Sequence, residues 1–502
     1  MKTKIARRHT LAYAIALAMA LLLLPGFYFF PAVGDDLLSV LFFKDSFIWG
    51  KPFDWTTYIA NVREIYFGLH FRLPQLLMPF MMLIPKWIPA VISSAAAGYL
   101  LVGGSRMGAF LRSWKAMVLY ATGIVLLFPW TDQMYLISFQ VPYLWGAALS
   151  LMLLKMILAP GSANVWLAGI LGFVTGFWME AYAGAVFGAC VCLAIFYKEY
   201  RTKTIYIVTA ALACGILTAA IPLMVYDKWT NWPDFHGRMI MVYPYLAVIA
   251  LHALMSVLML RRHRREVVNS LNLTLLELGI ASAILTVSFE AGARICGFGV
   301  ICALIGVIRL ARCMEWGRGL AASVAVVLTG AFAVCHLVVV DVLCYRMGKE
   351  TDYVLDRYLH HGESPVFTQL TLREDAPLLA LQKPYFDWFA HDRPLKVFEK
   401  IYGDGNRPIE VVPRSLQDFA PAKAELIEGS ARLYYYDGYL VGADTTLWMF
   451  ITDFGHGPSP CYYHKVAFDG SDRRRYLWLH PDNASVDFLL NKKPLRVDSI
   501  PE

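Results

Sequence analysis

The sequence predicts a mainly α-helical protein: a polytopic transmembrane helical bundle followed by a small soluble C-terminal α+β domain. Apolar runs of about 20 residues, the length that crosses a bilayer, recur from Leu11 to Val342 and then stop. Hydrophobic residues make up 58% of the chain and charged residues 17%, whereas soluble domains have roughly 45–50% and about 25%. We therefore expect two parts, residues 1–345 in the membrane and residues 346–502 outside it.

The first apolar run, Leu11 to Phe30, follows a basic leader and lacks a small-residue cleavage site, so we expect an uncleaved anchor. The run from Phe71 to Gly104 is interrupted by four prolines, and we expect it to form an interfacial helix near 73–84 and a span near 87–104. Further spans are predicted near 116–129, 141–159, 164–179, 181–197, 204–226, 240–260, 272–289, 293–312 and 319–343. The bundle would then have about eleven spans, and its longest outer loop, 31–72, would carry interfacial helices.

Basic residues gather on one side when the chain alternates across the membrane. The positive-inside rule places these connections and the N-terminus in the cytoplasm, and an odd number of spans places the C-terminus outside. We therefore interpret the net charge of +7 as topological and expect no nucleic-acid partner. The residues concerned are Arg106, Arg112, Lys115, Lys155, Lys198, Arg201, Lys203, Arg261, Arg262, Arg264, Arg265, Arg309, Arg312 and Arg318.

The chain after Arg346 has the composition of a soluble module. Helices are predicted near 349–361 and 375–390, followed by short strand-like runs separated by Gly, Asp and Pro. These runs are Ile409–Val412, Ala431–Tyr435, Leu447–Thr452, Tyr462–Ala467, Tyr476–Leu479 and Ser485–Leu490. Most of the nine cysteines lie in the apolar runs and only Cys461 lies well inside this module, so no disulfide framework is expected.

Two adjacent carboxylates, Asp35 and Asp36, follow the first span where the chain leaves the bilayer. Close carboxylates raise one another's pKa and share cations, so the pair could supply a general base, a metal ligand, or both. The alternative is that one of them simply caps a helix that begins at Leu37. Both interpretations fit the sequence.

Other outer turns bring further charged groups to the same depth. Glu180 lies in a hairpin so tight that its carboxylate must sit at the membrane surface, where a charge costs on the order of 2–3 kcal/mol and needs a partner or a task. Arginines suit phosphate recognition, but a helical Glu290–Arg294 pair, snorkelling of Arg238 and interfacial anchoring of Arg72 are alternatives. The candidate cationic and substrate-binding residues are His70, Arg72, His236, Arg238 and Arg294.

Within the spans, His252, Glu277 and His336 are expected to form interhelical hydrogen bonds. Aromatic residues crowd the outer turns; most fit an interfacial belt, and a minority could line a carbohydrate site. The sequence contains no P-loop, GxSxG, HExxH or paired CxxC motif, so energy coupling through nucleotide binding is not expected.

Four passages together resemble the GT-C superfamily of polytopic membrane glycosyltransferases, and in pattern the bacterial DUF6056-type membrane protein family most closely. They are Asp35-Asp36, Leu83–Ile88, Gln140–Trp145, and the Glu180 turn followed by Arg294. The chain departs from that pattern in two places: it has Gly68–Arg72 where the family tends to show Asn-Gly-Arg, and Pro142-Tyr143 where it tends to show Asn-Tyr. Arg72 and Tyr143 are therefore carried over only as candidate substrate contacts.

The resemblance implies an inverting transferase that moves a sugar from a polyprenyl-phosphate donor to an envelope glycan or lipid acceptor, on the outer side of the bacterial cytoplasmic membrane. It implies that Asp35 is the base and that Asp36 or Glu180 positions the acceptor or a divalent cation. Arg294 or Arg238 would neutralise the leaving lipid phosphate, because a fixed arginine stabilises developing negative charge.

Other function classes remain open. A membrane acyl- or phosphoryl-group transferase of envelope glycans would use the same face, although no early span shows a convincing motif for acyl transfer. A transporter would predict an internal repeat and discontinuous helices, which the sequence does not show. A scaffold for the outer domain fits if the acids are helix caps.

Overall fold

The computed structural model describes residues 2–32, 36, 55–68, 72–130, 134–159, 164–225, 239–288, 293–314 and 319–360, and seven strands between 366 and 479. The chain divides into two compact units. Unit 1 consists of Met1–Ala32 and Phe42–Tyr345, and unit 2 consists of Val33–Leu41 and Arg346–Glu502. Each unit is described by itself.

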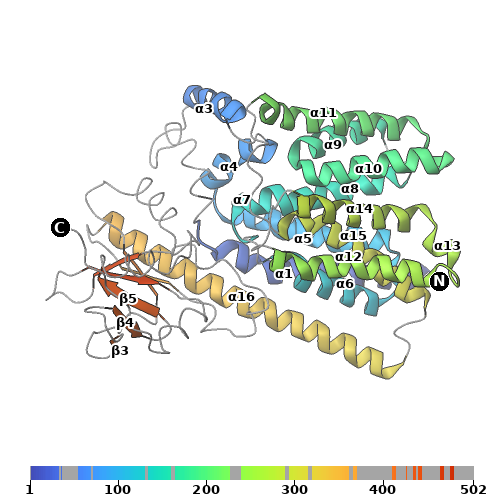
Figure 1. The fold of residues 1–502 in the computed structure, drawn as a ribbon. Coiled ribbons are helices and arrows are strands. Elements are labelled where there is room, and N and C mark those ends of the chain that lie inside the picture. Colours follow the sequence, from blue (N-terminus) through green and yellow to red (C-terminus); the bar gives the residue numbers. More distant parts are fainter. Residues whose placement is uncertain are drawn as a thin grey trace, which may run out of the picture. The chain divides into compact units, whose positions relative to one another are not determined.

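Unit 1 is a bundle in which most of the helices run side by side (Figure 1). Its first helices are α1 (Lys2–Phe29), α3 (Trp55–Gly68), α4 (Leu73–Leu83), α5 (Trp87–Met107), α6 (Trp114–Leu127), α7 (Ile137–Phe139), a π-helical segment η2 (Gln140–Trp145) and α8 (Gly146–Ile157). They are followed by α9 (Val165–Trp178), α10 (Glu180–Phe196), α11 (Lys203–Val225), α12 (Met239–Met259), α13 (Arg264–Val267), α14 (Ser270–Ser288), a 3-10 turn η5 (Ala293–Cys296), α15 (Gly297–Cys313) and α16 (Leu320–His360), whose residues up to Tyr345 belong to unit 1.

Seven of the described helices are long and apolar enough to cross a membrane, and four shorter apolar helices accompany them. Large apolar side chains such as Trp166, Val257 and Leu328 are exposed on the surface of the bundle, which a water-soluble domain would bury. Unit 1 is therefore a multi-pass membrane domain. The predicted division of the run after Phe71 is also present, since α4 and α5 are separate helices with Pro85 between them.

Close helix packing in unit 1 depends on small residues. Helices α9 and α11 approach so closely at Gly176 and Gly215 that a methyl group added at Gly215 would lie 2.8 Å from the Gly176 Cα. One turn earlier, a methyl group on Gly172 would lie 3.3 Å from the Val208 carbonyl oxygen. In a bilayer the hydrophobic effect does not drive helices together, because lipid tails are as apolar as the helix surfaces. Small residues let the helix backbones approach closely, and the resulting van der Waals packing stabilises the contact.

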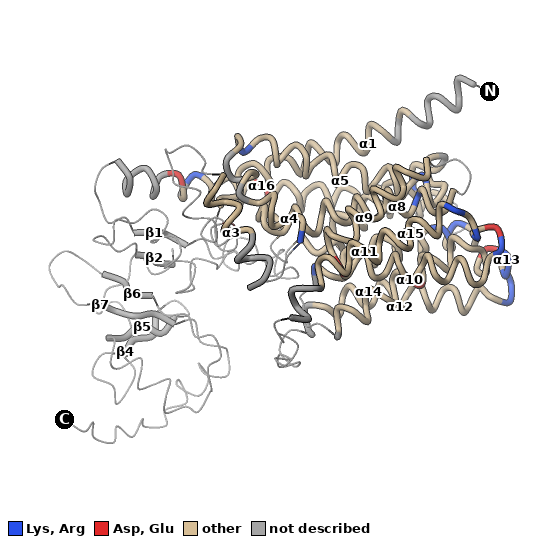
Figure 2. Tube along the Cα trace, turned by 90° about the horizontal axis from the view of Figure 1, so that it is seen from above, with Lys and Arg blue, Asp and Glu red and all other residues tan. Residues whose placement is uncertain are grey.

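Charged residues mark the two ends of unit 1 differently. Lys and Arg residues gather at the end where α13 lies, as Figure 2 shows. They lie in the connections α10–α11 and α12–α14 and in the last turn of α15. We call this the α13 end. Arg72, Glu180 and Arg294 lie at the beginnings of α4, α10 and α15, which is the opposite end. The described helices thus have the charge asymmetry that the sequence predicts; which end faces the cytoplasm stays a prediction.

In unit 2, strands β1 (Val366–Gln369) and β2 (Glu410–Pro413) pair in parallel. Five further strands form an antiparallel sheet in the order β3-β4-β5-β7-β6. They are β3 (Glu425–Leu426), β4 (Leu433–Tyr436), β5 (Tyr439–Ala443), β6 (His464–Ala467) and β7 (Arg475–Leu479). Tyr436 pairs with Tyr439 across Asp437-Gly438, the sequence signature of a two-residue hairpin.

Two expectations for the C-terminal part were wrong in detail. The span near 319–343 and the helix near 349–361 are one continuous helix, α16, because the residues that join them include no proline and the single Gly348 does not end a helix. Strands β1, β3 and β5 were not predicted, although β5 follows a strong hairpin signal. The runs Leu447–Thr452 and Ser485–Leu490 and the helix near 375–390 lie outside the described residues.

We predict that Gly215→Ala destabilises unit 1 by roughly 1–3 kcal/mol, because the new methyl group meets the backbone of α9, which cannot move aside as a side chain can. Thermal unfolding of the full chain in lipid nanodiscs measures this. Gly184→Ala is the matched control, since nothing lies within 4 Å of a methyl group there, and its effect should stay within about 0.5 kcal/mol. Equal unfolding temperatures for the two variants would contradict the packing argument.

Candidate functional site

Four predicted site residues meet at the end of unit 1 opposite α13. Arg72 precedes α4, Tyr143 belongs to the π-helical segment η2, Glu180 is the first residue of α10, and Arg294 lies in the turn η5. Together with Phe139 and Tyr182 they form what we call the Arg72 cluster. Its members come from five separate segments, so only the folded bundle creates it.

Arg72 and Glu180 form a bidentate ion pair. The Arg72 Nε donates to the Glu180 Oε2 at 2.6 Å, and the Arg72 Nη2 donates to the Oε1. The side chains are 18% and 31% exposed, respectively, so the pair is partly shielded from solvent. Both residues sit where their helices favour them: the Arg72 backbone N–H donates to the Gln75 side chain at 2.9 Å, and a carboxylate at the first position of α10 faces the positive end of that helix.

The Arg72 guanidinium stays charged in this setting. Burial alone would lower its pKa, but the Glu180 carboxylate and the neighbouring Tyr143 hydroxyl act in the opposite direction, and the net pKa lies above its ordinary value. A carboxylate at the membrane boundary was expected to need a partner. For Glu180 that partner is Arg72, which lies 108 residues earlier in the chain.

Arg294 is held by aromatic rings. Its Cζ lies 4.6 Å from the centroid of Phe139 and 5.6 Å from that of Tyr143, and these two rings are stacked at 5.9 Å with an interplanar angle of 12°. The Tyr182 hydroxyl donates to the Arg294 carbonyl at 2.7 Å and fixes the turn that carries it. Cation–π attraction of this kind grows when the cation is desolvated. Tyr143 therefore lies next to both guanidinium groups.

The π-helical segment that presents Tyr143 is fixed by buried polar side chains. The Gln140 amide donates to the Tyr135 carbonyl at 2.7 Å and accepts from the Ser93 hydroxyl at 2.6 Å. The Trp178 Nε1 donates to the Val141 carbonyl at 2.8 Å. Pro142 has no backbone N–H, which suits a stretch where the regular α-helical bonds are interrupted, and π-helical turns often occur at functional sites.

Sequence reasoning missed several of these residues. Phe139 and Ser93 were not singled out, Gln140 entered only as the first residue of the passage Gln140–Trp145, and Tyr182 only as one of the aromatic residues of the outer turns. Pro142 inside an apolar span was a signal that the helix there departs from regular geometry. The local alternative for Arg294, an ion pair with Glu290, involves a residue outside the described part of the chain.

The remaining predicted residues fall elsewhere. Asp35, His70, His236 and Arg238 lie outside the described residues. Asp36 is described, is 1% exposed and belongs to unit 2. The described residues contain no group of three or more His, Cys, Asp and Glu side chains placed to hold a metal ion; a cation bound through Asp35 and Asp36 would involve a residue beyond that part, and so stays a prediction.

The intramembrane predictions had mixed outcomes. The interhelical hydrogen bond expected for His252 is confirmed, because its Nε2 lies 3.2 Å from the Asn272 Oδ1 and so joins α12 to α14. The expectation for Glu277 was wrong: its Oε2 is buried and has no hydrogen-bond partner among the described residues. Its Oε1 instead occupies space left by Gly188 of α10, where an added methyl group would lie 2.7 Å away.

Chemically, the Arg72 cluster can receive an anion. Arg72 forms an ion pair with Glu180, and Arg294 lies on the faces of Phe139 and Tyr143, so two guanidinium groups lie next to the Tyr143 ring. Guanidinium groups bind phosphate oxygens through two parallel hydrogen bonds. Aromatic faces beside them offer an apolar surface for a ring such as that of a sugar.

No protein-family model matches this chain, and no curated protein matches it significantly. The resemblance to the GT-C superfamily and to the DUF6056-type family therefore stays an expectation carried by the four sequence passages. Two of those passages, Gln140–Trp145 and the Glu180 turn with Arg294, lie side by side in the Arg72 cluster.

We predict strong coupling between Arg72 and Glu180. Glu180→Gln should destabilise the protein by roughly 1–3 kcal/mol, less than for a fully buried pair because both side chains are partly exposed. Arg72→Gln combined with Glu180→Gln should be less destabilising than the sum of the single changes, with a coupling free energy of about 0.5–3 kcal/mol. Thermal unfolding of the four proteins of this cycle in nanodiscs gives the value; additive effects would mean that the ion pair contributes nothing.

Proposed function

We propose that this chain is a GT-C-type glycosyltransferase that moves a sugar from a polyprenyl-phosphate donor to an envelope glycan or lipid acceptor. The observation that carries the proposal is the Arg72 cluster: two oriented guanidinium groups and stacked aromatic rings at one end of an apolar bundle. Such a site suits a ligand that combines a phosphate, a ring and a lipid tail, because the tail can remain in the bilayer.

The proposed topology places this cluster outside the cytoplasm. The seven long helices and the four shorter apolar helices together make about eleven spans. Basic residues at the α13 end favour the cytoplasmic side for that end and for the N-terminus. In this arrangement the Arg72 cluster lies at the outer surface of a bacterial cytoplasmic membrane, and the C-terminal part follows on the same side as an α+β domain.

The proposed reaction is an inverting displacement at the anomeric carbon. Asp35 takes the proton of the acceptor hydroxyl, the hydroxyl oxygen attacks the anomeric carbon, and the bond from that carbon to the phosphate oxygen breaks with its electron pair on the phosphate. Arg294 stabilises the negative charge that develops there. Arg238 and His236 are further candidates for this contact, and His70 for a contact to the substrate.

Two acids have supporting roles in the proposal. Glu180 orients Arg72 toward the donor through the bidentate pair, which we favour over direct contact of Glu180 with the acceptor. Asp36 positions the acceptor, and a divalent cation shared with Asp35 is an open alternative. Tyr143 and Phe139 keep the Arg294 guanidinium in place and offer their ring faces to the sugar.

The test is a transfer assay with the purified full chain in nanodiscs and labelled polyprenyl-phosphate sugars. Asp35→Asn should reduce the rate on the order of 10²–10⁴-fold, as expected for loss of a general base, and Arg294→Gln on the order of 10²–10³-fold, as expected for loss of charge stabilisation. Lys155→Gln, an exposed residue at the α13 end, is the matched control and should leave the rate unchanged.

Full activity in both Asp35→Asn and Arg294→Gln would overturn the mechanism. Absence of transfer from every polyprenyl-phosphate sugar would overturn the activity itself and favour a transporter or a scaffold. Transfer of an acyl or phosphoryl group by the same purified chain in nanodiscs would identify the alternative transferase class.

A further inference from the structure

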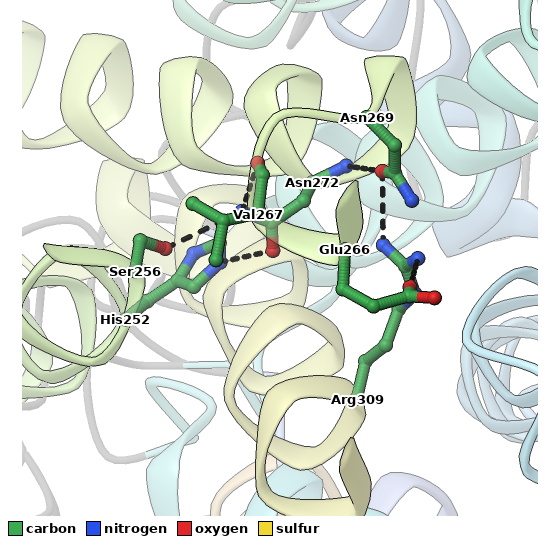
Figure 3. Close-up of polar contacts among 7 residues, drawn as sticks. All are labelled: His252, Ser256, Glu266, Val267, Asn269, Asn272 and Arg309. Carbon is green, nitrogen blue, oxygen red and sulfur yellow. Dashed lines mark hydrogen bonds and ion pairs between the residues drawn. The ribbon is translucent and has the colours of Figure 1, made fainter. Parts of the chain in front are cut away.

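A second polar cluster lies at the α13 end and joins residues of α12, α13, α14 and α15. Figure 3 shows its side chains. Arg309 of α15 pairs with Glu266 of α13, and its Nη1 donates to the Asn269 Oδ1 at 3.0 Å. The same Asn269 oxygen accepts from the backbone N–H of Asn272 at 2.8 Å and so begins α14. These bonds attach the short helix α13 to α15 and to α14.

The buried side of this cluster fixes the turn further. Asn272 is fully buried, and its amide donates to the Val267 carbonyl at 3.1 Å and to the Ser256 hydroxyl at 3.3 Å. Its oxygen meets His252, whose ring lies against Gly306, where a methyl group would overlap it. The turn between α12 and α14 is therefore held at a defined position relative to three long helices.

Four arginines of the turn take no part in this network. Arg261, Arg262, Arg264 and Arg265 are exposed, and no side chain among the described residues forms an ion pair or hydrogen bond with them. The acid of the turn, Glu266, is engaged by Arg309. The turn thus presents four uncompensated positive charges within five residues.

The arginines adjoin a lipid-facing surface. Leu254, Val257 and Leu258 of α12 are 54%, 69% and 69% exposed, and Val268 after the arginines is 43% exposed. Apolar side chains exposed on a membrane-spanning helix face hydrocarbon, so the charges that directly follow them lie at the depth of the headgroups. At that depth the available anions are the phosphates of the lipids themselves.

We infer that Arg261, Arg262, Arg264 and Arg265 form a specific binding site for the headgroups of anionic phospholipids. Charge complementarity selects a headgroup whose phosphate is not neutralised by an amine, and the guanidinium groups can donate paired hydrogen bonds to its oxygens. The bonds that fix the turn keep the four guanidinium groups close to one another. This distinguishes the four arginines from the other basic residues at the α13 end, which are spread over several connections. The inference does not depend on the proposed glycosyltransferase activity.

The test compares two triple variants of the full chain that lose the same charge. Arg261→Gln/Arg264→Gln/Arg265→Gln removes three of the four arginines of the site, and Lys155→Gln/Lys198→Gln/Lys203→Gln removes three exposed lysines elsewhere at the same end. Binding of phosphatidylglycerol and phosphatidylcholine to the detergent-purified proteins is followed by native mass spectrometry across a lipid titration. The single variants Arg264→Gln and Arg265→Gln provide the same readout if the arginine triple does not fold.

We expect the wild type to bind phosphatidylglycerol saturably and at least about tenfold more tightly than phosphatidylcholine. The arginine triple should lose about tenfold of that affinity, each single variant about twofold to threefold, and the lysine triple less than about twofold. Equal binding of the two lipids by the wild type, or equal losses in the two triples, would overturn the site. Displacement of the lipid by inorganic phosphate or an acidic peptide at equal concentration would overturn the choice of ligand.

Discussion

A charged side chain inside an apolar bundle needs a partner, and this requirement determines which helices of unit 1 contact one another at the charged residues. A lone charge at membrane depth costs several kcal/mol, and three of the described charged groups meet that demand in different ways, whereas Glu277 keeps a buried carboxyl oxygen without a partner among the described residues. Glu180 binds Arg72, Glu266 binds Arg309, and Arg294 lies on the faces of two aromatic rings. Each partnership joins segments far apart in the chain, so the polar groups that are costly to bury also determine how the helices meet.

Glycines in the helices leave the space that buried polar side chains and close helix contacts need. Gly306 leaves room for the His252 ring that contacts Asn272, and Gly188 leaves room for the Glu277 carboxyl. The same absence of a side chain brings α9 and α11 into backbone contact at Gly176 and Gly215. In a membrane the helices gain little from hiding apolar surface from lipid, so close approach and buried hydrogen bonds take over the role of the hydrophobic core.

Features that depend on local composition could be predicted from the sequence. Apolar length located the helices, and Pro85 located the break between α4 and α5. Features that depend on distant residues could not: the Arg72–Glu180 pair spans 108 residues, and no local pattern links Ser93 to Gln140. The sequence did not predict that α16 is continuous, for a different reason. Hydropathy indicates where an apolar span ends, but the helix can continue into polar sequence beyond that point.

The two ends of unit 1 use arginine in different ways, and the difference follows from what holds each side chain. Arg72 and Arg294 are fixed by a carboxylate and by aromatic rings, so their charge acts at one point in space. Among the described residues no side chain holds the arginines of the α13 turn; only the backbone that carries them is fixed. A developing charge in a reaction is stabilised best by groups that are already oriented, whereas a mobile lipid headgroup can be bound by flexible side chains on a fixed turn. This difference is why we propose a reaction at the Arg72 cluster and lipid binding at the α13 end.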